Sequence, residues 1–179
     1  MTALWNSYIT GPLLGVLWAM VVATTVAALM SLSTGDPFQP GLIGCLLMGA
    51  VFGAAVVQPA SRAAILVGAV VLTLGLSYTA ISPVHMAPDA GFGQHLTGAL
   101  AFGLGLAWPL SVMMDGAPRG PLNRHEWEEA VLRFLTGFGY VVFTAAVLIP
   151  FYVMVMTSLK SQGELIANPL DFTIDLSRG

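Results

Sequence analysis

The stretch from Phe134 to Met156, FLTGFGYVVFTAAVLIPFYVMVM, contains no charged residue and is the strongest apolar segment of the chain. A helix needs about 20 apolar residues to cross the hydrocarbon core of a bilayer, so this segment predicts a transmembrane helix. Of the 179 residues, 56% are hydrophobic and only 8% are charged, and the mean hydropathy is +0.83. An ordinary soluble domain has roughly a quarter charged residues. The composition therefore predicts a membrane protein and excludes a soluble globular one.

Further apolar segments precede this one, separated by turns that contain glycine, proline or charged residues. They run from Gly11 to Thr34, from Pro40 to Gln58, from Ala63 to Ser82 and from Gly91 to Met114. We therefore predict an all-α polytopic membrane protein with five transmembrane helices. Spans of this length leave no room in 179 residues for a sizeable soluble domain.

The segment before the last span has the pattern of a short amphipathic helix. Its apolar residues follow the i, i+3, i+4, i+7, i+8 spacing, at Trp127, Ala130, Val131, Phe134 and Leu135. Asn123 followed by Glu126 predicts a helix N-cap, and Glu129 with Arg133 is an i, i+4 ion pair. We interpret this segment as an interfacial helix that anchors the chain at the membrane surface. A docking surface for a cytoplasmic partner is the alternative.

The positions of the arginines predict which loops face the cytoplasm. Lys and Arg are retained on the cytoplasmic side, and the loops before the third and fifth spans contain Arg62, Arg119, Arg124 and Arg133. The loops after the first and third spans contain only the acidic residues Asp36 and Asp89. We expect a cytoplasmic N-terminus and an external C-terminal tail. The predicted parts are an extension of four spans (1–115), a cytoplasmic loop with the amphipathic helix (116–136), a fifth span (137–157) and the tail (158–179).

Small residues recur inside two of the spans at spacings that place them on one helix face. Gly49 and Gly53 lie four residues apart in the second span. The fourth span contains Gly98, Ala99, Ala101, Gly103 and Gly105. Such faces let two helices approach closely inside a membrane, where there is no hydrophobic drive between helices. We favour packing within the chain over a dimer interface, and we interpret the single cysteine, Cys45, as an inert packing residue.

The sequence offers no residues for catalysis or for a cofactor. No Asp, Glu, Lys or Arg lies in the middle of a span, which argues against a pump or an ion-coupled carrier. Phosphate-binding loops, a nucleophile elbow and a zincin motif are absent from the sequence, and we predict no enzyme activity and no metal site. A net charge of −3 without a basic cluster excludes nucleic acid as a partner. We interpret His85 and His95 as solvated loop histidines; a metal or haem site is the alternative.

The most specific pattern lies between Ala145 and Pro169, AAVLIPFYVMVMTSLKSQGELIANP. It resembles the first core transmembrane helix and the following periplasmic segment of the maltose-type carbohydrate ABC transporter permeases. Those proteins typically show a Pro-aromatic pair, a Ser-Phe-Lys triplet, a Glu and an Asn-Pro turn. The matching positions are Pro150, Phe151, Ser158, Lys160, Glu164, Asn168 and Pro169. Leu159 stands where the family usually has Phe.

The resemblance covers about residues 121–179 and implies a location and a set of partners. It implies a permease component in a bacterial inner membrane, with a periplasmic C-terminal tail, as the arginine positions also predict. The family works with a second permease subunit, cytoplasmic ATPase subunits and a periplasmic sugar-binding protein. The chain lacks the family's Glu-Ala-Ala docking loop, because in the nearest match, Glu129-Ala130-Val131 with Gly137, the glycine is too far away and the segment enters a span.

We therefore expect an N-terminal portion of such a permease that lacks the translocation core. The first four spans would be an extension that contributes scaffold, and the chain alone would not transport sugar. The alternative is a stand-alone accessory or assembly subunit of a larger membrane protein complex. Small size, small-residue helix faces and the lack of charge inside the spans motivate that alternative.

Overall fold

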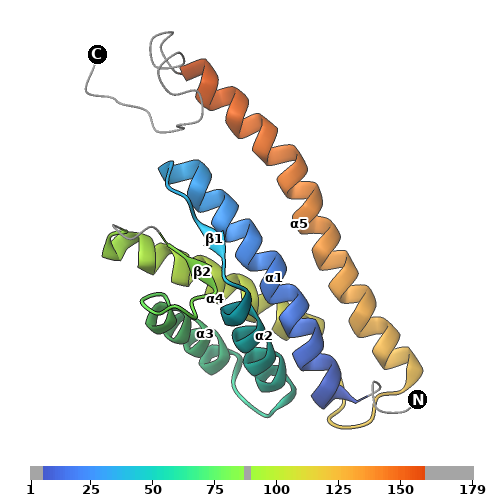
Figure 1. Ribbon diagram of the computed structural model, residues 1–179. Coiled ribbons are helices and arrows are strands. Elements are labelled where there is room, and N and C mark those ends of the chain that lie inside the picture. Colours follow the sequence, from blue (N-terminus) through green and yellow to red (C-terminus); the bar gives the residue numbers. More distant parts are fainter. Residues whose placement is uncertain (1–5, 87–89, 160–179) are drawn as a thin grey trace.

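The structure, a computed structural model, describes residues 6–86 and 90–159 and is built almost entirely from helices. Five helices and one pair of two-residue strands follow one another along the described chain (Figure 1). The elements are α1 (Ser7–Thr34), β1 (Gln39–Pro40), α2 (Leu42–Val57), α3 (Arg62–Leu76), β2 (Val84–His85), α4 (Phe92–Met113) and α5 (Arg124–Leu159). The predicted all-α class is confirmed, and each predicted span overlaps one of the five helices.

The predicted number of membrane spans is wrong, because three helices, not five, are long and apolar enough to cross a membrane. These are α1, α4 and α5 over Arg124–Val155. The helices α2 and α3 have 16 and 15 residues. At 1.5 Å per residue they are about 24 and about 22 Å long, and a hydrocarbon core is about 30 Å thick.

The short helices end where the backbone chemistry stops them, although the apolar composition continues. Helix α2 begins after Pro40 and Gly41, and it ends at Gln58, where the chain is extended before Pro59. Helix α3 ends at Ser77, and the apolar residues that follow lie in turns that lead to the buried Pro83. A count of apolar residues includes these turns, so it overestimates the helix length.

Helices α1 and α2 cross with their main chains in direct contact through glycines on both sides. A Cβ atom built on Gly15 would overlap the carbonyl oxygen of Gly49 and would lie 2.9 Å from the Cα of Gly53. A Cβ atom on Gly53 would overlap the carbonyl oxygen of Gly11. The predicted Gly49/Gly53 face is thus used within the chain, against the Gly11/Gly15 face of α1. Close backbone approach of this kind is a main source of helix association in membranes.

Helices α3 and α4 pack through a second close contact. A Cβ atom on Gly103 would lie 2.8 Å from the backbone nitrogen and Cα of Val70, next to the fully buried Ala69. Gly98, one helical turn or so earlier in α4, lies under the side chains of Met30 and Met86. Of the small residues predicted to form one face of this span, Ala101 is exposed. The other small residues Gly98, Ala99 and Gly103 of α4 pack inside the chain.

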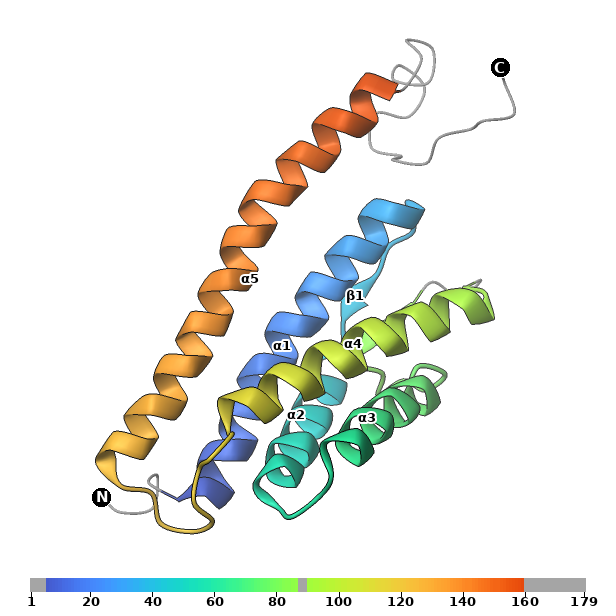
Figure 2. The same cartoon turned by 180° about the vertical axis from the view of Figure 1, so that it is seen from behind.

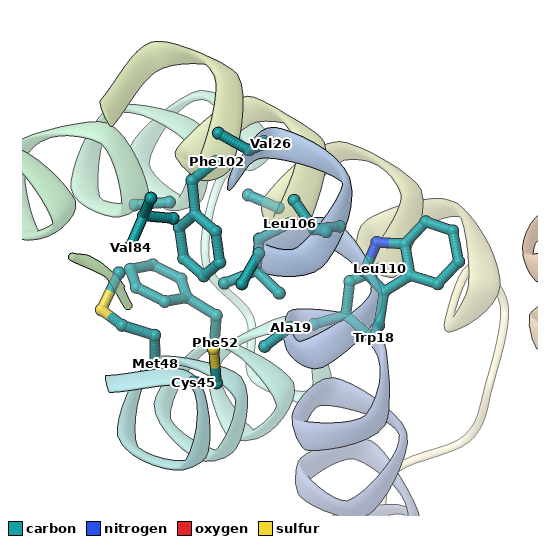
Figure 3. Packing of buried hydrophobic residues seen from close by; sticks show 14 of the residues in the cluster. Trp18, Ala19, Val26, Cys45, Met48, Phe52, Val84, Phe102, Leu106 and Leu110 are labelled. Atoms are coloured by element: carbon teal, nitrogen blue, oxygen red, sulfur yellow. The ribbon is translucent and has the colours of Figure 1, made fainter. Parts of the chain in front are cut away.

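The apolar core lies where α1, α2, α3 and α4 meet (Figure 3). Phe102, Leu106 and Leu110 of α4 are fully buried and form its centre. Cys45 is buried among them, and its thiol lies 3.6 Å from the carbonyl oxygen of Pro83. This agrees with its interpretation as a packing residue.

The connections between helices gather at two opposite ends. At one end β1 pairs with β2, with Gln39 opposite His85, and so joins the α1–α2 connection to the α3–α4 connection. At the other end Ser7 exchanges hydrogen bonds with Gly120, of 3.2 and 2.8 Å. A salt bridge of 2.7 Å between Arg62 and Asp115 joins the α2–α3 connection to the end of α4. The described arginines and the start of the chain's first helix therefore share one end.

We predict that Gly15→Ala destabilises the bundle, whereas Gly75→Ala does not. The added methyl group at Gly15 would overlap α2, and overpacking of this kind costs about 1–3 kcal/mol. Gly75 in α3 has open space around it, and alanine favours a helix by up to about 1 kcal/mol over glycine. The measurement is SDS titration with a maleimide dye that reports exposure of the single, buried Cys45. Equal midpoints for the two variants would contradict the glycine crossing.

Candidate functional site

The candidate site is the interface between α5 and the other helices, because α5 contains Pro150, Phe151 and Ser158, three of the seven positions that carry the family resemblance. The helix starts with the predicted cap: a Glu126 carboxylate oxygen accepts the backbone N–H of Asn123 at 2.7 Å. The predicted pair of Glu129 and Arg133 is present, with 2.6 Å between oxygen and nitrogen. Both features stabilise the first turns of a helix.

The predicted amphipathic helix and the predicted fifth span are one continuous helix. Helix α5 runs through 36 residues from Arg124 to Leu159. Its first proline after the cap is Pro150, so no residue in between forces a break. Ala130 is buried against Leu14 of α1 in a small apolar cluster. Part of the amphipathic face therefore packs against the chain's own bundle.

Arg133 ties α5 to the end of α4. Its guanidinium donates to the carbonyl oxygen of Asp115 at 2.7 Å and, more weakly, to that of Val112 at 3.4 Å. The last carbonyls of a helix have no partners within it, and a cation there is favourable for the helix dipole. The side chain of Asp115 in turn meets Arg62. Arg133 therefore joins α5, α4 and the α2–α3 connection in one polar network.

Trp18 of α1 makes the second link, and a proline explains its position. Pro109 in α4 has no backbone N–H, so the carbonyl of Gly105, four residues earlier, has no donor from that position. The indole nitrogen of Trp18 donates to this carbonyl oxygen at 2.9 Å. Its ring also packs edge-on against Phe134 of α5, with 6.0 Å between centroids. The Trp18 side chain therefore supplies the donor that α4 lacks and also packs against α5.

Helix α5 runs beside the other helices and extends past the end of α1 (Figures 1 and 2). Two open grooves lie along it. One groove of about 860 Å³ lies between α4 and the first half of α5. The other, of about 540 Å³, lies between α1, α4 and the second half of α5. Phe143, which is 69% exposed, lies between these parts of the helix. A weak contact of 3.5 Å from the Tyr152 hydroxyl to the carbonyl of Leu32 spans the second groove.

The structure describes three of the seven positions that carry the family resemblance. Pro150 is exposed, and α5 continues past it to Leu159. Phe151 is 59% exposed and lines the second groove. Ser158 donates its hydroxyl to the carbonyl of Val155 at 2.7 Å. The other four positions, Lys160, Glu164, Asn168 and Pro169, lie outside the described residues.

The interpretation of His95 as a solvated loop residue is wrong, because α4 begins at Phe92 and buries it. Its Nδ1 lies 3.0 Å from the hydroxyl of Ser77, and its ring stacks on Tyr78 at 4.2 Å. The Ser77 hydroxyl already donates to the carbonyl of Leu74 at 2.7 Å, so Nδ1 must be the donor in this pair.

His85 does remain an exposed residue, on the short strand β2. The metal interpretation needs several ligands that converge, and His95 has a structural partner instead. Within residues 6–86 and 90–159, no group of three or more His, Cys, Asp or Glu side chains is placed to hold a metal ion. The His95 side chain therefore contributes packing against Tyr78 and a hydrogen bond to Ser77.

The sequence contains a signal for the free carbonyl in α4 and for the glycine crossing, but it contains none for the role of Trp18. Glycine at 105 followed by proline at 109 predicts a carbonyl that needs an outside donor, and Gly11 with Gly15 repeats the spacing of Gly49 with Gly53. The partner of the carbonyl, Trp18, is 87 residues away in sequence and is found only from the packing of α1 on α4.

Comparison of the chain with family models, with curated proteins and with solved structures gave no match. The fold itself defines the class: a helical protein with three helices that are long and apolar enough to cross a membrane.

We predict that Trp18→Phe and Pro109→Ala are coupled. Trp18→Phe leaves the Gly105 carbonyl without its donor, and an unsatisfied buried polar group costs about 1–3 kcal/mol. An alanine at position 109 restores a backbone N–H four residues from this carbonyl, so Trp18→Phe should cost less in that background. A double-mutant cycle of unfolding free energies in SDS measures the difference. Strict additivity of the two changes would contradict the link.

Proposed function

We propose that this chain is a membrane-spanning component of a bacterial carbohydrate ABC importer, located in the inner membrane. The ordered set of residues in α5 and its tail, from Pro150 and Phe151 to Asn168 and Pro169, carries the proposal. Seven positions match in order, and only the residue between Ser158 and Lys160 departs from the family pattern.

The packing of α5 supports the proposal. In α1, 50% of the most apolar window is buried inside the chain, and in α4 the figure is 44%, whereas in α5 it is 0%. Exposed side chains such as Phe143, Phe151 and Met154 cover the outer half of α5. A helix of this kind suits a junction, because its first half is attached to α1 and to the end of α4. Its second half has surface for helices of a permease core.

In this proposal the chain contributes scaffold and an outer lip, and its partners do the chemistry. The ATPase subunits bind and hydrolyse ATP, a second permease subunit shares the pathway, and the periplasmic protein delivers the sugar. The N-terminus would be cytoplasmic and the C-terminal tail periplasmic. This orientation is supported by the gathering of Arg62, Arg119 and Arg133 at the end of the bundle that also holds Ser7.

The second candidate is an accessory or assembly subunit of a larger membrane complex. One observation favours it: α1 to α4 form a bundle with its own core and two close glycine-mediated crossings. Such a unit would act as a scaffold without any role in transport. The two candidates differ in the partners that they require, so partner identity separates them.

We expect the tagged chain, expressed at its natural level and purified in mild detergent, to retain an ATPase subunit with a phosphate-binding loop and a sugar-binding protein. Phe143→Asn should reduce their recovery, because it places an amide on the outer face of α5. Phe92→Asn is the matched control, since Phe92 in α4 is exposed to a similar degree, 65% against 69%. The readout is quantitative mass spectrometry of the co-purified proteins.

Recovery of a respiratory or photosynthetic complex without any ATPase subunit would favour the accessory subunit. Equal loss of partners in both variants would show that α5 is not the junction. On its own, the 179-residue chain should not restore sugar uptake to a permease-null strain. Restored uptake would contradict the expected division of labour between this chain and a translocation core.

A further inference from the structure

The groove between α4 and α5 has a charged end and an apolar length. Glu129 and Arg133 of α5 lie at one end, and the walls beyond them are apolar and aromatic, with Leu104 and Trp108 on α4 and Tyr140 on α5. The volume is about 860 Å³. Trp108 is 65% exposed and Tyr140 is 70% exposed, so both rings are open along the apolar length of the groove.

The length of the groove corresponds to one leaflet of a bilayer. It extends along α4 from Leu104 to Met113 and along α5 from Glu129 to Tyr140. At 1.5 Å per residue these segments are about 14 and about 16 Å long, which is half of a hydrocarbon core of about 30 Å. The charged end is the end that carries Asp115 and Arg62, where the helix connections gather.

Helices α4 and α5 are in contact at the charged end of the groove, which limits the kind of occupant there. Arg133 reaches from α5 to the carbonyl oxygen of Asp115 at 2.7 Å. A Cβ atom on Gly137 would lie 2.9 Å from the Cε of Met113. At this end a helix about 10 Å across cannot enter between α4 and α5, whereas a narrow, flexible hydrocarbon chain can.

The arginine at the charged end of the groove selects the headgroup of the lipid. The Arg133 side chain is 38% exposed, and its only side-chain partner given by the described residues is Glu129, which is 49% exposed. The ion pair with Glu129 balances its charge, so a phosphate binds here in competition with that carboxylate. Arginine binds phosphate through a planar fork of donors, and anionic lipids attract arginines close to the membrane surface. The groove beside the second half of α5 has no charged residue among its described lining.

We propose that the groove between α4 and α5 binds an anionic phospholipid, with its phosphate beside Arg133 and one acyl chain along Leu104, Trp108 and Tyr140. The lipid fills the space between α5 and the bundle in one leaflet. Glu129 competes with the phosphate for the guanidinium, so it limits the affinity. The inference does not depend on the proposed transport function, because the site is formed within this chain.

The test is native mass spectrometry of the full chain released from nanodiscs, one set made of palmitoyl-oleoyl-phosphatidylglycerol and one of palmitoyl-oleoyl-phosphatidylcholine. We expect the wild-type chain to retain phosphatidylglycerol in preference to phosphatidylcholine. Arg133→Gln should lower phosphatidylglycerol retention about fivefold, since one arginine near an anionic surface contributes about that factor. Glu129→Gln should raise it. Arg124→Gln is the matched control, because Arg124 is on the same helix but does not line the groove.

A second pair of variants tests the acyl chain separately from the charge. Thr136→Trp fills the groove and should abolish retention, whereas Leu135→Trp adds the same ring at an exposed position outside the lining. Cys45 labelling shows that each variant is folded. Equal retention of the two lipids, or no effect of Arg133→Gln and Thr136→Trp on retention, would overturn the proposal. Dimers that disappear in Thr136→Trp while lipid retention is unchanged would assign the groove to a second copy and would also overturn it.

Discussion

The contact between the main chains of α1 and α2 is the constraint on which the rest of the bundle depends. In a membrane, lipid solvates apolar side chains as well as protein does, so helices must gain stability from close packing. Gly11 and Gly15 on one side and Gly49 and Gly53 on the other remove the side chains that would separate the helices. This contact holds the short α2 against a helix of 28 residues, and it sets the space that Phe102 and its neighbours fill.

The second constraint is the hydrogen bond that Trp18 donates to the carbonyl left free by Pro109. Pro109 removes a donor from the ladder of α4, and a free carbonyl in an apolar interior is costly. The indole of Trp18 supplies the missing donor, so the position of the proline decides which turn of α4 packs on α1. Because the same indole ring also packs against Phe134, this hydrogen bond also fixes the point where α5 joins the bundle. Local chemistry in one helix therefore determines an interface between three.

The sequence predicted those parts of the fold that depend on local chemistry. Helix positions, the Asn123–Glu126 cap, the Glu129–Arg133 pair and the buried Cys45 all follow from composition and spacing. The lengths of α2 and α3 were not predictable from hydropathy, which counts apolar residues in turns as though they were helical. The burial of His95 depends on the packing of Ser77 and Tyr78, which lie in the turn after α3.

In the candidate site, too, the sequence indicates local features but not how the helices pack. Sequence identifies Pro150 and Phe151 as a pattern, but only the structure shows that Ala130, Arg133, Phe134 and Gly137, in the first half of α5, attach this helix to the bundle. In the second half, the hydrogen bond of 3.5 Å from Tyr152 to Leu32 is long, and a bond of that length contributes little. The outer half of α5 can therefore exchange lipid for protein neighbours at small cost, because the contacts that hold the core and the polar end stay in place.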